Sequence, residues 1–349
     1  MLLNLQNVNL FWNIKDLKIH LEWIFYLSYK GYMYTKLTWN NYEIVEQIKE
    51  NINPNQQLSA LTLLLWSYYG YDIYFEYLKD ENIVLFYARA NEQLKLIEND
   101  NIANQFIDKF FIIFIYFNDE KYNWTTLIPI ALKALKENFK NQSLLVASGI
   151  VYEDYLNDLL KFNHELVYTW YSNFIYETES LKYFRGKALQ KKRNNLNFFI
   201  KNFKEDYEII KYDSQIHLNK VCVFLKNWDI KNFINSKSML VNSNCDLLSN
   251  TQNNPYFAGS ILVKKSTNEI VGFTLVYIRP NIAEIIIEQT DRQIRGMYQY
   301  LLSQNLIINN VNNLLIDRQD GAWSDNISAS KLSYQPKIIT KRANILIKE

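Results

Sequence analysis

The chain has 349 residues, of which 48% are hydrophobic and 21% are charged, and its formal net charge is +2. This length is enough for two domains with a sizeable buried core. A charge so close to neutral excludes a general nucleic-acid coat protein, so any contact with a polyanion must be local. No stretch approaches the ~18 consecutive apolar residues that suggest a membrane-spanning helix, and no cleavable signal peptide is visible.

Cysteine and histidine are too few and too scattered to indicate a metal centre. Cys222 and Cys245 are the only cysteines, and the three histidines lie far apart in the sequence. No spacing resembles a zinc site or a disulfide framework, so we expect no metal site. A catalytic Cys–His pair is the alternative that this spacing favours least. A reduced, cytoplasmic protein is the expectation, peripheral at the inner face of the membrane if its acceptor is a lipid.

In the first half, helical and strand patterns alternate. Residues 1–33 form an aromatic extension with three interpretations: a partner-binding helix, a membrane-surface helix, or a segment upstream of a true start at Met33. The patterns that follow predict helices over 34–53, 58–69, 91–98 and 127–139, and strands over 72–78, 83–88 and 110–117. The polar residues 79–82 predict a hairpin between the first two strands, and an apolar run occupies residues 144–151.

A basic segment joins the two halves. Neither Gly nor Pro interrupts residues 187–203, and Leu189, Leu196 and Phe199 recur at helical spacing, which predicts one amphipathic helix. Its beginning is crowded with cations, where positive charge opposes the helix dipole: Arg185, Lys187, Lys191, Lys192 and Arg193. Helix stability does not require this arrangement, whereas an anionic partner would explain it. The alternative is a solvated basic face at a domain junction.

The second half repeats the order helix, hairpin, strand, helix, strand. We predict a helix over 219–233, a polar loop over 242–254, strands over 257–264, 269–278, 283–288 and 313–317, a helix over 292–307, and a closing segment over 337–347. Strands that alternate with helices in this way are typical of an α/β fold.

The strand at 283–288 runs through a short turn, with Arg295 and Gly296, into a helix. A helix N-terminus exposes unpaired N–H groups that suit a phosphate or a carboxylate. GNAT-type acyltransferases hold the coenzyme A pyrophosphate at this place with a Q/R-x-x-G-x-G/A motif. Here Tyr298 replaces the last glycine of that motif and obstructs the close approach of a pyrophosphate. The sequence therefore favours a donor other than acyl-coenzyme A. Acyl-coenzyme A as the donor remains the alternative.

Over roughly residues 34–349 the chain resembles the phosphatidylglycerol lysyltransferase C-terminal-domain family. Three blocks carry the resemblance: Leu181 to Phe199, with Gly186-Lys187 and Lys191-Lys192-Arg193-Asn194; Ile287-Glu288 with Ile294-Arg295-Gly296-x-Tyr298-Gln299; and Asp317-Arg318-Gln319-Asp320 with Lys331-Leu332-Ser333-Tyr334-x-Pro336. A weaker block, Leu64-Leu65-Trp66, extends it into the first half.

This resemblance implies an α/β (α+β) fold of two tandem GNAT-like domains, each a mixed, mainly antiparallel sheet flanked by helices. The corresponding division is an extension over 1–33, a first domain over 34–170, a basic linker helix over 171–204, and a second domain with the site over 205–349. Membrane-bound relatives move an amino acid from aminoacyl-tRNA to a lipid hydroxyl, and a similar tandem fold serves peptidyltransferases that build peptidoglycan cross-bridges.

By resemblance, we expect an aminoacyltransferase with aminoacyl-tRNA as donor, a lipid hydroxyl or an amine as acceptor, and no resident cofactor. Glu288 and Lys331 are the candidate catalytic residues, as base or amine-binding carboxylate and as oxyanion cation. The candidate donor-binding residues are Lys187, Lys191, Lys192, Arg193, Arg295, Gly296 and Arg318. Tyr298, Tyr334 and Trp323 are candidates for stacking or acceptor contact. Each also has a plainer interpretation, as a surface charge, a local ion pair or a core aromatic.

The chain departs from the family in two places. The family tends to have Asn-Arg-Glu where Asp317-Arg318-Gln319 stands here, and Leu-Arg where Ile327-Ser328 stands. Losing that arginine removes a fork-shaped phosphate donor. A second hypothesis is therefore a non-catalytic module that keeps the fold and binds an anionic lipid or RNA.

Overall fold

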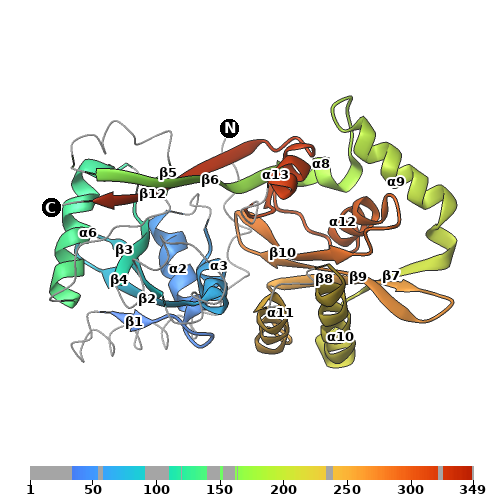
Figure 1. Ribbon diagram of the computed structural model, residues 1–349, viewed down its shortest axis with the longest axis horizontal. Coiled ribbons are helices and arrows are strands. Elements are labelled where there is room, and N and C mark those ends of the chain that lie inside the picture. The colour runs from blue at the N-terminus through green and yellow to red at the C-terminus, as the bar shows by residue number, and fades with distance from the viewer. Residues whose placement is uncertain are drawn as a thin grey trace, which may run out of the picture.

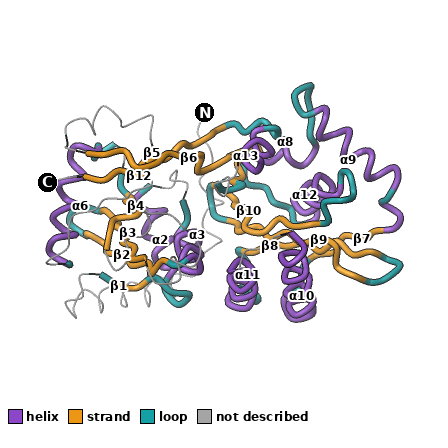
Figure 2. Tube along the Cα trace, viewed as in Figure 1, coloured by secondary structure: helices purple, strands orange, loops and turns teal. Residues whose placement is uncertain are grey.

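The structure is a computed structural model, which describes residues 34–53, 58–90, 110–118, 120–139, 150–151, 162, 164–232, 239–320 and 325–347. The strands of this part of the chain form two sheets, of four and of eight strands. Helices cover both faces of each sheet (Figures 1 and 2). The predicted α/β class, with mixed, mainly antiparallel sheets flanked by helices, is confirmed.

The smaller sheet is antiparallel, in the order β1-β2-β3-β4. Its strands are β1 (Thr35–Lys36), β2 (Tyr71–Leu78), β3 (Ile83–Ala90) and β4 (Phe110–Tyr116), and its helices are α2 (Tyr42–Ile52), α3 (Ala60–Trp66) and α6 (Trp124–Asn138), with the short turn η2 (Ser67–Tyr69). Residues 83–88 of β3 are an unbroken apolar run, as expected for a strand with both faces buried. Val84 and Phe86 pack with α2 and α3, whereas Leu85 and Tyr87 pack with α6.

The larger sheet has the order β5-β12-β6-β11-β10-β9-β8-β7. Its strands are β5 (Ile150–Val151), β6 (His164–Glu177), β7 (Tyr207–Lys211), β8 (Phe257–Lys264), β9 (Glu269–Ile278), β10 (Ile282–Thr290), β11 (Leu315–Asp317) and β12 (Ile338–Ile347). β10 and β11 pair in parallel, whereas the other neighbours pair antiparallel.

Two helix layers cover this larger sheet. Its helices are α8 (Thr178–Tyr183), α9 (Gln190–Asn202), the short η3 (Lys204–Asp206), α10 (Ser214–Asn232), α11 (Met239–Asn250), α12 (Met297–Ile308) and α13 (Asp325–Leu332). Leu262 and Val276 pack in one cluster with α9 and α12. Ile261 and Phe273 face the other way, into a cluster with α10 and α11 that continues into α2 and α3. The two halves therefore share one apolar cluster.

The longest strand pair links the two halves. β12 runs along β6 from Ile338 opposite Ile175 to Ile347 opposite His164, and Figure 1 shows this ribbon passing from the second half over the first. At its far end Ile347 is buried in the cluster that α6 forms with the smaller sheet. The last strand of the described chain therefore completes the core of the first half. The predicted division into domains stays a prediction.

Three predictions about local structure are wrong. The helix predicted over 34–53 begins only at Tyr42, because Thr35 and Lys36 pair with β2 as strand β1. Residues 242–254 were predicted as a polar loop, but most of them belong to α11, because Leu247 and Leu248 are buried against α10 and the sheet while the asparagines lie mainly outside. Residues 171–204 are not one linker helix, since they contain the end of β6 followed by α8 and α9. Residues 1–33, the helix over 91–98 and most of the run 144–151 lie outside the described residues.

Candidate active site

The candidate site lies where β10 and β11 separate. Their parallel pairing ends with Glu284 opposite Asp317, while β10 continues along β9. Beyond this last pair, Glu288 of β10 faces Arg318, the residue that follows β11. Arg318 Nη2 lies 2.7 Å and Arg318 Nε 3.1 Å from Glu288 Oε2. The side chains of Glu288 and Arg318 are only 11% and 9% exposed, so this ion pair is nearly buried.

The ion pair leaves one polar atom of each partner unused. Both arginine nitrogens bond to the same oxygen of Glu288, so Glu288 Oε1 and Arg318 Nη1 have no hydrogen-bond partner among the described residues. Buried polar atoms are usually paired, because leaving one unpaired costs free energy. A carboxylate oxygen can accept a proton or a hydrogen bond, and a guanidinium nitrogen can donate one to an oxyanion. The site therefore presents one acceptor, on Glu288, and one donor, on Arg318.

Tyr334 forms one wall of this site. Its side chain is 3% exposed, its hydroxyl accepts a 2.6 Å hydrogen bond from Gln299, and the Arg318 guanidinium lies 4.4 Å from its ring centre. Lys192 of α9 lies over the same ring, with Nζ 3.8 Å from the centre. Burial, with the positive charge of Arg318, lowers the pKa of Lys192 to about 8. The basic helix therefore delivers one lysine into the candidate site.

Lys331 holds the loop after β11. Its ammonium group donates to the backbone carbonyl oxygens of Arg318, Gln319 and Asp320, the second at 3.2 Å. Gln319 has a positive φ of 58°, so this loop needs such support. Burial, with the charge of Arg318, lowers the pKa of Lys331 to about 8. An ammonium has three donors and all three are used here, so this arrangement favours a positioning role. The direct oxyanion role stays a prediction.

The other basic residues of the linker divide into two groups. Lys187 and Lys191 are exposed, on the segment before α9 and on its first turn. Arg193 instead donates to the carbonyl oxygens of Phe184, at 2.6 Å, and Gly186, at 2.9 Å, and so holds the chain between α8 and α9. Phosphate binding by all three stays a prediction, and Arg193 has a structural contact as well.

Arg295 and Gly296 lie against α9. The Arg295 Nε donates to the Asn195 side chain at 2.9 Å, and its guanidinium lies 4.7 Å from the Phe198 ring. Gly296 has a φ of 87°, and a Cβ at this position would lie 2.0 Å from the Asn195 carbonyl oxygen. Glycine is therefore required for the packing of α9 on the N-terminus of α12. Phosphate binding at this helix end stays a prediction, although α9 lies where a phosphate would approach.

Tyr298 lies beside Glu288. Burial raises its pKa, with a further rise from the charge of Glu288, and its hydroxyl is hydrogen-bonded by Arg292 and by the backbone of Thr290. The structure thus brings Tyr298 to the site, close enough to Glu288 and Tyr334 to interact with them electrostatically. Trp323 lies outside the described residues.

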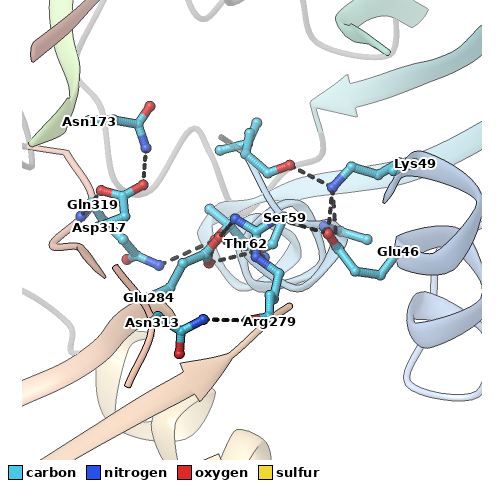
Figure 3. A network of polar contacts seen from close by, with 12 residues as sticks. Glu46, Lys49, Ser59, Thr62, Asn173, Arg279, Glu284, Asn313, Asp317 and Gln319 are labelled. Carbon is cyan, nitrogen blue, oxygen red and sulfur yellow. Dashed lines mark hydrogen bonds and ion pairs between the residues drawn. The ribbon is translucent and has the colours of Figure 1, made fainter. Parts of the chain in front are cut away.

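A buried polar network, which the sequence analysis missed, joins residues of the two halves (Figure 3). Arg279, 3% exposed, forms ion pairs with Glu46 of α2, at 3.2 Å, and Glu284 of β10, at 2.6 Å. Glu284 also accepts hydrogen bonds from Ser59, at 2.7 Å, and Thr62, at 3.2 Å, at the beginning of α3. This network connects the two halves through charges that are almost completely buried.

The network reaches the candidate site through the loop after β11. Gln319 donates to the Thr62 hydroxyl at 3.2 Å, and its backbone N–H donates to Asp317 at 2.7 Å. Asp317 is 1% exposed and accepts a hydrogen bond from Asn173 of β6 (Figure 3). Burial, with the charge of Glu284, raises the pKa of Asp317 to about 7. No spacing in the sequence signals these partners, because they come from elements far apart along the chain.

Within the described residues, no group of His, Cys, Asp and Glu side chains has a geometry that could hold a metal ion. In the same part of the chain, no helix is both long and apolar enough to cross a membrane.

Comparisons with solved structures define the class of protein. The C-terminal domain (DUF2156) of a putative lysylphosphatidylglycerol synthetase from Agrobacterium fabrum is similar over 88% of this chain and 93% of its own, with a TM-score of 0.54 and 11% identity. A conserved protein of unknown function from Bacteroides thetaiotaomicron is similar over 90% of this chain and 99% of its own, with a TM-score of 0.68 and 18% identity. The chain therefore shares the fold of these two structures, one of which is a C-terminal domain of the kind that the resemblance named.

Sequence comparison then gives the family. The uncharacterized protein MYCGA3080 of Mycoplasmoides gallisepticum is 32% identical over 311 residues, which cover 87% of this chain and 96% of the relative. The chain belongs to the same family as MYCGA3080. No protein-family model matches the chain.

Proposed function

We propose that the protein is an aminoacyltransferase that moves an amino acid from aminoacyl-tRNA to a hydroxyl or an amine. Its acyltransferase-type fold is shared with the domain of the putative lysylphosphatidylglycerol synthetase. The observation that carries the proposal is the pair of unused atoms, Glu288 Oε1 and Arg318 Nη1, at the place where β10 and β11 separate. Acyl transfer requires one group that removes a proton and one that stabilises an oxyanion, and these two atoms can supply them.

In the proposed reaction, the acceptor oxygen or nitrogen forms a bond to the carbonyl carbon of the aminoacyl ester. Glu288 takes the proton of the acceptor as this bond forms. Arg318 donates through Nη1 to the oxyanion of the tetrahedral intermediate. The bond to the ribose oxygen of the tRNA then breaks, and that oxygen receives the proton from Glu288. Lys331 keeps the loop that carries Arg318 in position through its three carbonyl contacts.

The basic segment supports a tRNA donor. Arg185, Lys187 and Lys191 are exposed beside Lys192, whose ammonium lies over Tyr334 within the site. Exposed cations can bind backbone phosphates by releasing counterions. The 3′ end of a tRNA that contacts these residues would enter the site past Lys192 and Tyr334.

Exposed apolar side chains support a lipid acceptor over a free amine. Helix α13, which carries Lys331, and the beginning of β12 present large apolar residues to solvent: Ile327, Leu332, Ile338 and Ile339, at 37–42% exposure. Exposed apolar side chains on neighbouring segments are typical of a contact with a partner or a membrane. We propose that α13 and the beginning of β12 lie against the membrane that supplies the acceptor lipid.

The test compares two donors in separate reactions. The purified protein is mixed with vesicles that contain anionic phospholipid and with either aminoacyl-tRNA, labelled in the amino acid, or labelled acetyl-coenzyme A. We expect label to enter the lipid phase from tRNA and not from acetyl-coenzyme A. Transfer from acetyl-coenzyme A alone would refute the proposal and establish an ordinary acetyltransferase.

A second function is supported by Lys331, whose three donors are all bound to backbone carbonyl groups. A protein that kept the fold without the reaction would bind an anionic lipid or RNA through the basic segment. Tight, salt-dependent binding of tRNA or anionic vesicles with no transfer from any donor would favour this function over the first.

A further inference from the structure

The only two cysteines of the chain lie in contact with each other. Cys222 belongs to α10 and Cys245 to α11, two helices that pack side by side under the larger sheet. Both residues are half-buried, and their thiols are hydrogen-bonded to each other. Neither belongs to the candidate active site or to the network between the halves. Their meeting is therefore a feature that the proposed function leaves unexplained.

The contact suits a disulfide. A disulfide needs sulfur atoms about 2 Å apart and Cβ atoms about 4 Å apart, which neighbouring helices provide when their cysteines face each other. A hydrogen bond between the two thiols places the sulfur atoms next to each other, on helices that pack together. In a reducing compartment such a pair remains in the dithiol form until an oxidant is present.

The surroundings distinguish the two thiols. The hydrogen bond from Cys222 lowers the pKa of Cys245 and outweighs burial and the charge of Asp246, which raise it, while the positive charge of Lys226 lowers it slightly further. The same hydrogen bond, with burial, raises the pKa of Cys222. Because the thiolate is the reactive form, Cys245 is the nucleophile and Cys222 is the thiol that reacts second.

We propose that Cys222 and Cys245 form a redox-active dithiol that hydrogen peroxide converts into an intramolecular disulfide. The Cys245 thiolate attacks one peroxide oxygen, which gives a sulfenic acid and, after protonation of the leaving hydroxide, one water. The Cys222 sulfur then attacks the Cys245 sulfur and loses its proton, and the sulfenic hydroxyl leaves as a second water. Two thiols are oxidised to one disulfide, and one peroxide is reduced to two waters.

The disulfide would join two helices with different attachments. On α10, Trp228 donates a 2.8 Å hydrogen bond to the Thr290 carbonyl oxygen at the end of β10, close to the candidate site. On α11, Asp246 is hydrogen-bonded to Tyr68 of the first half. Oxidation would thus link covalently the helix that holds the site strand to the helix that contacts the first half.

The experiment oxidises the full-length protein with a slight excess of hydrogen peroxide and follows free thiols, intact mass and peptide maps. We expect both thiols to disappear together, the mass to fall by two hydrogen atoms, no covalent link between chains, and full reversal by dithiothreitol. In Cys222→Ser, Cys245 should accumulate as a sulfenic acid that dimedone traps. In Cys245→Ser, the remaining thiol should react at least ~10-fold more slowly than in the wild type.

Three results would overturn the proposal. The first is survival of both thiols in the folded protein under conditions that oxidise the urea-unfolded chain. The second is a disulfide between chains in place of the internal one. The third is a disulfide that forms no faster in the folded protein than in urea, which would mean that the helix contact does not promote it.

Discussion

Glu284 and Glu288, four positions apart in strand β10, differ in how completely their carboxylate oxygens are paired. Glu284 pairs with Arg279 and also accepts hydrogen bonds from Ser59 and Thr62 of the first half. Glu288 pairs with Arg318 through one oxygen only, and its other oxygen has no hydrogen-bond partner among the described residues. Both oxygens of Glu284 have partners, Oε1 in the ion pair with Arg279 and Oε2 in hydrogen bonds, so this carboxylate can hold the fold together, whereas a carboxylate with an oxygen outside both kinds of contact can bind a ligand.

The difference follows from position relative to the last β10–β11 pair. Glu284 is part of that pair, opposite Asp317, and contacts the beginning of α3 in the first half. Glu288 lies beyond it, where β11 has ended and only the Arg318 loop covers the strand. The comparison predicts that changes around Glu284 mainly lower stability, and that changes around Glu288 mainly lower activity.

The largest expected effect on stability comes from Arg279→Ala. This change leaves Glu46 and Glu284 as buried carboxylates without their shared cation, and the free energy of unfolding should fall by about 3–5 kcal/mol. Urea unfolding followed by circular dichroism measures it. Lys36→Ala, which breaks the exposed pair with Asp72, is the control and should cost less than about 1 kcal/mol. Equal losses in the two variants would show that the Arg279 network does not hold the halves together.

Arg318→Lys should separate activity from stability. Lysine keeps a positive charge for Glu288 but lacks the second donor that Nη1 supplies. The rate of aminoacyl transfer should fall about 10²–10³-fold, as when one oxyanion donor is lost. The free energy of unfolding should change much less than in Arg279→Ala. A variant with the wild-type rate would mean that Nη1 does not contact the reacting group.

Asp317, which lies opposite Glu284 and directly precedes Arg318, should make the free energy of unfolding depend on pH. Burial raises its pKa in the folded state to about 7, from an ordinary value of 3.8, so the folded protein keeps its proton longer than the unfolded chain. The stabilisation is therefore complete below about pH 4 and is lost as the pH rises towards 7, by roughly 1 kcal/mol per pH unit at most. Urea unfolding between pH 4.5 and 7.5, in ~1-unit steps, should show a shallower decline for Asp317→Asn. Identical declines for wild type and variant would assign the effect to other groups.

The smallest expected effect is on donor binding. Replacing Lys187 and Lys191 together by Gln removes two exposed cations near the site, and should weaken tRNA binding several-fold and reduce its salt slope by about 1–2. Lys201 and Lys204, exposed at the far end of the same segment, provide the matched double Gln control. If the control variant weakens binding as much, the contact is a general charge effect and not a tRNA site.

Local patterns predict much of this fold. The hairpins β2–β3 and β8–β9 and the buried strand β4 follow from apolar runs separated by short polar turns, and the structure confirms them. The local pattern does not predict helix α11, because its asparagines and serines suggest a loop. Its packing against α10 explains why it is a helix. The long β6–β12 pair also depends on a partner that is remote in the sequence.

The sequence predicts some residues of the candidate site but not the contacts that they make. The resemblance identifies Glu288, Arg318, Lys331 and Tyr334, and the structure brings them together. It does not reveal that Lys331 binds three carbonyl groups, since that depends on the fold of the loop after β11. Nor does it reveal Arg279, whose importance lies in burial between Glu46 and Glu284 rather than in any motif.

The most direct test of the central claim is the single-turnover rate of transfer from labelled aminoacyl-tRNA, measured for the wild type and for Glu288→Gln. If Glu288 accepts the proton of the acceptor, Gln should slow the chemical step about 10²–10⁴-fold while tRNA affinity stays near the wild-type value. Transfer at an unchanged rate by a folded Glu288→Gln variant would contradict the account, because the carboxylate at the end of β10 would then play no part in the reaction.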